Sequence, residues 1–211
     1  KVISVGVGLD IAKFQNAETG SIIAKKMPDD KCNLVYVGKL EERRNIGFLL
    51  ELFVKISEKK KNVHFTIVGN GDKKYEAGIM GTIISLEQSG ILEYYPHATQ
   101  SELAEVYKKA DIMVFPSLYE IYGMVLMEAM YFGTAVVSSA NGGATALIDH
   151  GQDGIIVNDF QKEHWLAAVL QLIDDPKFLL KLKRNAEVKI KKKFTWDMVA
   201  KKFIKIYQEM I

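Results

Sequence analysis

Two carboxylates, Glu120 and Glu128, stand eight positions apart in a stretch whose pattern changes from strand to loop to helix. The apolar run 111–115 predicts a strand, 116–122 a loop, and 123–132, rich in Met, Leu and Ala, a helix. In an open parallel sheet, ligands bind at the carboxyl ends of the strands, where the next helix begins with unpaired backbone N–H groups. Glu120 is therefore predicted to lie at the rim of a binding crevice.

Glu128 is the more unusual carboxylate because its neighbours are apolar. Residues 126–130 otherwise read as a buried helix, where an ionised carboxylate is costly unless it accepts hydrogen bonds. Ligand hydroxyls would supply those bonds. A Lys or Arg partner, or a place on the solvated face of the helix, would also account for a single Glu here.

Composition limits the possible classes of protein. The chain has 211 residues, 48% of them hydrophobic, which suffices for one large or two small domains. A net charge of +2 argues against a nucleic-acid binder. Because Cys32 is the one cysteine, a disulfide within the chain is excluded and the cytoplasm is the favoured location. The four histidines lack the spacing of metal ligands, which argues against a metal site. The sequence begins at Lys1 without Met, so we expect a longer natural protein.

Strand and helix patterns alternate about six times along the chain. Apolar runs predict strands at 33–38, 63–68, 92–95, 111–115, 135–138 and 154–157. Such alternation predicts an α/β, Rossmann-like, doubly wound parallel sheet with helices on both faces. A capping box at Thr99–Glu102 starts one helix and Thr195 caps the last one. Residues 12–30 are polar and irregular, and we expect them to lie outside the core.

Polar groups follow several of these strands. Lys39 and Arg44 follow the first, the glycine turn 69–71 the second, residues 95–99 the third, and Gly142–Gly143 the fifth. Two cations beside a helix N-terminus make a site for a diphosphate. Singly, the cations read as surface charges and the glycine pair as a plain turn. Their joint position at one sheet edge favours the binding site.

Several familiar motifs are absent. The turn 69–71 lacks the third glycine of a dinucleotide-binding loop, since Lys74 stands there. Gly38–Lys39 lacks the remaining residues of a P-loop, and no Gly-x-Ser-x-Gly elbow occurs. Dinucleotide binding, P-loop chemistry and serine hydrolysis of that type are not supported.

The ordered set of motifs resembles the retaining glycosyltransferases of the GT-B fold, in the group 1 (GT4-like) family. Glu120 to Glu128 is similar to the family's E-x7-E element. Residues 38–45 resemble the family's G-R-L…K-G/N pattern, in which Lys39 replaces an Arg and Arg44 replaces a Lys. Residues 68–71 resemble its glycine turn, and residues 141–154 resemble its G-G…D/N-G segment. Residues 8–10 resemble the G-V-D that closes the linker between the two domains. The resemblance covers nearly the whole chain.

This resemblance implies the C-terminal, donor-binding half of a two-domain enzyme. Residues 1–30 would be the linker and lead-in from a missing N-terminal acceptor domain, 31–194 the nucleotide-sugar-binding domain, and 195–211 a helix packing toward the missing domain. The implied reaction is a metal-independent, cofactor-free hexosyl transfer from a nucleotide diphosphate-sugar to an acceptor hydroxyl, with retention. The fragment alone is expected to be inactive.

The resemblance also assigns roles to individual residues. Lys39 and Arg44 would hold the diphosphate, Glu120 would address the donor sugar, and these three form the implied catalytic set. Glu128 would accept hydrogen bonds from the ribose hydroxyls. The remaining implied donor-binding residues are Gly38, Ala98 in the loop along the base, Tyr122, and Gly123, Met124 and Val125 through their backbone N–H groups.

Three substitutions depart from the family pattern. Ile121–Tyr122 stands where Gly-Phe is usual, Ala146 replaces a common Glu, and Pro96–His97 occupies the place of a glycine. The first narrows the space beside the sugar, and the third alters the loop along the base.

The implied partners are a nucleotide-sugar donor and an acceptor sugar or lipid-linked glycan, with no nucleic acid. That suits cell-surface polysaccharide or glycolipid biosynthesis in the cytoplasm, at the inner face of the membrane.

The basic stretch 181–205 would attract anionic lipid, or would simply be the solvated face of its helices. Two other functions stay open: a GT-B sugar-nucleotide epimerase, which needs no acceptor, and a non-catalytic nucleotide-sugar-binding module.

Overall fold

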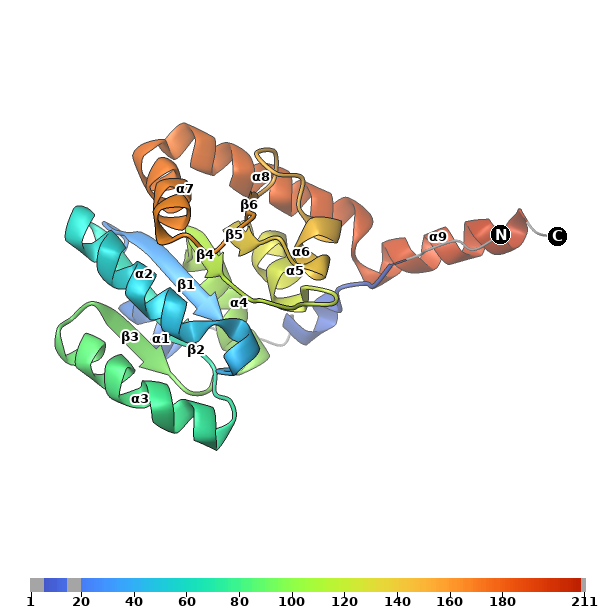
Figure 1. Ribbon diagram of the computed structural model, residues 1–211. Coiled ribbons are helices and arrows are strands. Elements are labelled where there is room, and N and C mark those ends of the chain that lie inside the picture. The colour runs from blue at the N-terminus through green and yellow to red at the C-terminus, as the bar shows by residue number, and fades with distance from the viewer. Residues whose placement is uncertain (1–5, 15–19, 210–211) are drawn as a thin grey trace.

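The computed structural model describes residues 6–14 and 20–209, and in this part of the chain six parallel strands form one central sheet (Figure 1). The strands are β1 (Cys32–Val37), β2 (Val63–Val68), β3 (Leu92–Tyr95), β4 (Ile112–Phe115), β5 (Ala135–Ser139) and β6 (Ile155–Val157). Their order in the sheet is β3-β2-β1-β4-β5-β6. The predicted doubly wound sheet is confirmed. Its switch point lies between β1 and β4, where ligands bind in such sheets.

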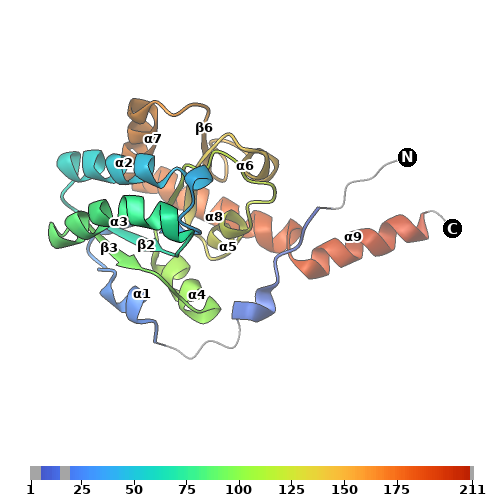
Figure 2. The same ribbon diagram turned by 60° about the horizontal axis from the view of Figure 1, so that its bottom comes forward.

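Helices cover both faces of the sheet. The helical elements are η1 (Ile11–Phe14), α1 (Ile22–Lys26), η2 (Glu42–Arg44), α2 (Ile46–Lys59), α3 (Lys73–Gln88), α4 (Gln100–Lys109), α5 (Met124–Tyr131), α6 (Gly142–Leu147), α7 (Lys162–Asp174), α8 (Pro176–Lys193) and α9 (Trp196–Gln208). Helices α2, α3 and α7 pack together on one face, and α1, α4, α5 and α8 on the other (Figures 1 and 2).

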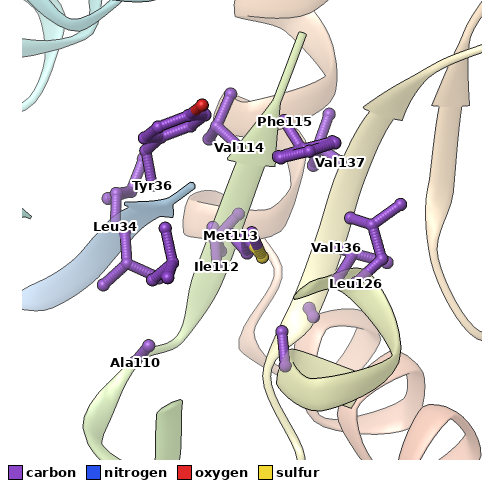
Figure 3. Packing of buried hydrophobic residues seen from close by; sticks show 14 of the residues in the cluster. Leu34, Tyr36, Ala110, Ile112, Met113, Val114, Phe115, Leu126, Val136 and Val137 are labelled. Atoms are coloured by element: carbon purple, nitrogen blue, oxygen red, sulfur yellow. The ribbon is translucent and has the colours of Figure 1, made fainter. Parts of the chain in front are cut away.

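The central strands are apolar because they are covered twice. Residues 34–37 of β1 and all of β4 are buried, as expected for a parallel sheet between two helical layers. Figure 3 shows this core, in which the rings of Tyr36 and Phe115 stack with centroids 5.8 Å apart. The capping box that starts α4 is confirmed: the Glu102 N–H donates to Thr99 Oγ1 at 3.2 Å, and the Thr99 N–H donates to the Glu102 carboxylate at 2.8 Å.

The expectation that residues 12–30 lie outside the core is wrong for three apolar side chains, Phe14, Ile23 and Met27. Ser21 caps α1, and Ile23 and Met27 are buried against the rest of the core. The N–H groups of Gly20 and Ser21 donate to the Glu105 carboxylate of α4 at 3.1 and 2.6 Å. Docking onto α4, not a local pattern, orders this segment. The domain boundaries given above stay predictions.

The last helix, α9, extends away from the body (Figures 1 and 2). Its start is anchored by a bridge in which the Leu9 N–H donates to the Phe194 carbonyl at 2.6 Å. Val199 is buried, but most of the large apolar side chains of α9 are exposed, namely Trp196, Phe203, Ile204 and Tyr207. That α9 packs toward another domain stays a prediction. None of the described helices is long and apolar enough to span a membrane.

Several lysines in the basic stretch 181–205 are paired. Lys183 donates to Asp111 at 2.9 Å, Lys189 contacts two aspartates at 2.9 and 2.8 Å, and Lys191 pairs with Glu187. Helix α8 buries Leu182, Ala186 and Ile190 on its other face. Because these three lysines already have acidic partners, they are less available to an anionic lipid headgroup.

Cys32 offers a test of burial at the start of β1. Burial, with a smaller effect of the Asp111 carboxylate, raises the pKa of its thiol from 9.0 to about 12. Because the thiolate is the reactive form, iodoacetamide at pH 8 is expected to modify the native chain roughly a thousandfold more slowly than the chain unfolded in guanidinium. Mass spectrometry over time measures both rates, and equal rates would contradict the burial of this thiol.

Candidate functional site

A cavity of about 290 Å³ lies at the carboxyl ends of β1, β2 and β3, beside the switch point of the sheet. Helices α4 and α5 close its other side. Its lining consists of Val37, Gly38, Lys39, Val68, Gly69, Asn70, Pro96, His97, Ala98, Gln100, Leu103, Val125 and Glu128. The position is the one that the sequence predicts for a ligand in this fold.

Five of the predicted site residues meet in this cavity. Gly38 and Lys39 come from the end of β1, Ala98 from the loop after β3, and Val125 and Glu128 from α5. Lys39 is solvent-exposed at the rim, where its ammonium can reach a ligand. Phosphate at this position would meet a cation and the first turn of α5 together.

The other predicted site residues lie beside the cavity. Gly123 is the N-cap of α5 with φ of 64°, in the left-handed region that favours glycine, and Met124 begins the helix. Tyr122 is 57% exposed and does not line the cavity. Arg44 and Glu120 also lie outside the lining, where they contact each other.

The wall between β1 and β2 is built by contacts between two backbones. The N–H groups of Gly38 and Leu40 donate to the carbonyls of Val68 and Asn70 at 3.0 and 2.9 Å. A Cβ atom on Gly69 would lie 1.9 Å from the Gly38 carbonyl oxygen. The predicted glycine turn is therefore required by the close approach of the loop that carries Lys39.

The Glu128 carboxylate faces the cavity from the second turn of α5. Burial raises its pKa above the ordinary value, against the opposing effect of a hydrogen bond from Tyr107. The Tyr107 hydroxyl donates to Glu128 Oε2 at 3.0 Å. Of the explanations left open by the sequence, an ion pair of Glu128 with a Lys or Arg is not found among the described residues, although the positive charge of Lys13 also acts to lower the pKa of Glu128.

Arg44 and Glu120 form a largely buried ion pair, with side chains 10% and 14% exposed. Arg44 Nη1 also donates to Ser117 Oγ at 3.3 Å, and the guanidinium lies 5.0 Å from the centre of the Phe115 ring. The fold thus joins one predicted diphosphate-binding cation to the carboxylate predicted to address the sugar. The loop after β1 and the loop after β4 are linked at this point.

The loop that carries Glu120 is held from two sides. On one side, the Leu118 N–H and the Ser117 hydroxyl donate to the Arg43 carbonyl at 2.8 and 3.2 Å. On the other, the Gly143 N–H donates to the Glu120 carbonyl at 2.8 Å. The backbone position of Glu120 is therefore fixed by segments before and after it in the chain.

The glycine pair 142–143 allows one of these contacts. Asn141 caps α6, because its side chain accepts from the Ala144 N–H at 2.9 Å. A Cβ atom on Gly143 would lie 2.7 Å from the Gly123 nitrogen. The pair is thus the start of a helix packed against the Glu120 loop, and not a plain turn.

Some residues of the site have no signal in the sequence. Tyr107 lies on α4, 21 positions before its carboxylate partner, and Ser117 reads as an ordinary loop residue. The Asn70 amide nitrogen lies 3.2 Å from the ring nitrogens of His97, and both residues line the cavity. Asn70 could have been found from its place inside the glycine turn. Within the described ranges 6–14 and 20–209, no three His, Cys, Asp or Glu residues converge in a way that could hold a metal.

The sequence model described as "Glycosyl transferases group 1" matches residues 21–189, which contain the sheet and the cavity. The chain is 30% identical over 187 residues to an uncharacterised glycosyltransferase of Methanocaldococcus jannaschii, covering 85% of this chain and 45% of the relative. It is 27% identical over 211 residues to a D-inositol 3-phosphate glycosyltransferase of Segniliparus rotundus, covering 99% and 47%.

Among solved structures, Anabaena HepE in complex with UDP-glucose aligns with a TM-score of 0.78 at 18% identity, over 96% of this chain and 56% of HepE. At this identity the likeness shows the fold alone. The chain spans about half the length of the curated relatives it matches.

Proposed function

The chain belongs to the group 1 family of glycosyltransferases, and we propose that it forms the donor-binding half of a retaining hexosyltransferase that needs no metal or cofactor. The whole protein would move a sugar from a nucleotide diphosphate-sugar to an acceptor hydroxyl. The chain alone would bind the donor without transferring the sugar, because the acceptor would be held by a second domain.

One observation carries this proposal: the Glu128 carboxylate lines the cavity at the switch point of the sheet. An ionised carboxylate accepts hydrogen bonds and donates none. It therefore suits a ligand with adjacent hydroxyls, such as a ribose. The loop 96–98 on the opposite wall would lie along the base. HepE, with the same fold, binds UDP-glucose, which supports a nucleotide-sugar as the ligand.

The diphosphate would lie between Lys39 and the first turn of α5. Lys39 supplies a cation, and the N–H groups of Gly123, Met124 and Val125 supply fixed donors. Arg44 would add a second cation from beside the cavity, next to Glu120, which would address the sugar ring. Fixed positive groups stabilise the negative charge that develops on the leaving diphosphate, the role that a metal ion has in other enzymes.

The setting of the reaction is proposed on the same basis. The acceptor would be a sugar or a lipid-linked glycan bound by the second domain, as suits cell-surface polysaccharide or glycolipid synthesis. The enzyme would work in the cytoplasm at the inner face of the membrane. The segment 195–211 would pack toward the second domain through the exposed apolar face of α9.

A thermal-shift screen of this chain tests the proposal. UDP, GDP, ADP, CDP and TDP would be compared, each with its common sugar conjugates. A ligand that binds only the native state adds about 2.7 kcal/mol of stability at a hundredfold excess over its dissociation constant. A shift with one nucleotide family would support the site and identify the base. No shift with any of them would contradict donor binding by this chain.

Glu128→Ala and Lys39→Ala are each expected to weaken binding of the nucleotide found in this screen. Each loses a charge-assisted hydrogen bond, which corresponds to about 1.5 to 3 kcal/mol of binding free energy. Calorimetry measures the affinity, and circular dichroism checks that both variants fold. Lys55→Ala on α2, whose ammonium pairs with Glu163 far from the cavity, is the control. Unchanged affinity in both variants would refute the site assignment.

A further inference from the structure

Tyr107 is a fully buried tyrosine in the last turn of α4. Its ring stacks on Phe132, with centroids 6.1 Å apart and planes at 13°. Its carbonyl accepts a hydrogen bond from the Thr134 hydroxyl at 2.6 Å. Side chain and backbone are thus both held by the region that follows α5, so the hydroxyl has a fixed position.

That hydroxyl is directed at the wall of the cavity. It donates to Glu128 Oε2 at 3.0 Å, and it is the one hydrogen-bond partner of the Glu128 side chain in the described part of the chain. Burial, and then the nearby Glu128 carboxylate, raise the pKa of Tyr107 well above its ordinary value. The hydroxyl therefore keeps its proton at neutral pH and acts as a donor to the carboxylate.

A carboxylate on a helix can rotate about its side-chain bonds, and one fixed hydrogen bond restricts that rotation. With Oε2 held by Tyr107, Oε1 is left to accept from groups inside the cavity that Glu128 lines. The geometry resembles that of other preorganised sites, in which a buried partner orients the residue that contacts the ligand.

We propose that Tyr107 is a positioning residue that orients the Glu128 carboxylate toward the vicinal diol of a ribose in a bound nucleoside diphosphate. This rests on the proposed function, since it requires that the cavity binds a nucleotide. Tyr107 itself does not line the cavity, so it acts only through Glu128.

The test compares Tyr107→Phe with the unaltered chain on two kinds of ligand. Phe keeps the ring that stacks on Phe132 and removes only the hydroxyl. The probes are UDP, GDP, ADP and CDP, each beside its 2′,3′-dideoxy analogue, with dissociation constants from calorimetry. We expect Tyr107→Phe to bind the ribonucleotide about tenfold more weakly and to bind the dideoxy analogue as the unaltered chain does.

Two controls separate orientation from a general loss of structure. Tyr131→Phe changes a tyrosine that packs on the same Phe132 ring, with centroids 5.0 Å apart, but lies outside the cavity. It should leave both affinities unchanged. In a Glu128→Ala background, Tyr107→Phe should have no further effect on the ribonucleotide, because the residue through which it acts is gone.

The possible outcomes separate a failure of the proposed function from a failure of the role proposed for Tyr107. If the unaltered chain binds none of the nucleoside diphosphates of the thermal-shift screen, the proposed function fails and this inference fails with it. If the chain binds a ribonucleotide but Tyr107→Phe loses affinity equally for both forms, or for neither, the inference alone is overturned. Selective loss of the ribonucleotide supports it.

Discussion

Gly69→Ala is expected to lower the free energy of unfolding by about 3 kcal/mol or more, or to prevent folding altogether. Gly69 has φ of 139°, a conformation that residues with a side chain rarely adopt. Its Cβ would lie 1.9 Å from the Gly38 carbonyl oxygen, which is backbone and cannot rotate away. The loop after β1 or the loop after β2 would have to move, and both form the cavity.

Gly81→Ala is the matched control for this variant. Gly81 lies within α3, is exposed, and has no atom within 4 Å of an added Cβ. The same change should therefore stabilise the chain, by about 0.5 to 1 kcal/mol, because Ala has the higher helix propensity. Urea unfolding followed by circular dichroism measures both variants. If Gly69→Ala were as stable as the unaltered chain, the close approach of the two loops would be wrong.

The sheet and the place of the cavity could be predicted because their signals are local. Each buried strand is a short apolar run between loops, and the start of α4 is marked by Thr99 and Glu102 three positions apart. Alternation of strands and helices then fixes a parallel sheet, and with it the edge where Lys39 and Glu128 meet.

Partners that pair over long distances in the chain could not be predicted in the same way. Arg44 and Glu120 are 76 positions apart, and either one alone reads as a surface charge or as a ligand. The burial of Ile23 could not be predicted for another reason. Ile23 belongs to a polar segment that is too short to show a hydrophobic periodicity, and docking onto α4 buries it. In both cases the deciding contact is tertiary, so no local pattern records it.

Glu120→Ala is the second variant for which we expect a large loss in the free energy of unfolding. The substitution would leave the Arg44 guanidinium buried without its anion. Removing one partner of a buried ion pair typically costs about 3 to 5 kcal/mol. We expect a loss near the lower end of this range, because both side chains keep slight exposure and Ser117 Oγ still accepts from Arg44 Nη1. Denaturant unfolding of Glu120→Ala measures it.

If the cost comes from the unpaired charge, removing both charges should restore stability. The double variant Arg44→Met, Glu120→Leu is therefore expected to be more stable than Glu120→Ala, because apolar groups of similar size can replace a buried pair with little loss. Glu163→Ala breaks the exposed pair with Lys55, whose side chains are 40% and 72% exposed, and should cost at most about 1 kcal/mol. A double variant less stable than Glu120→Ala would mean that the pair itself, and not the avoidance of an isolated charge, holds the two loops together.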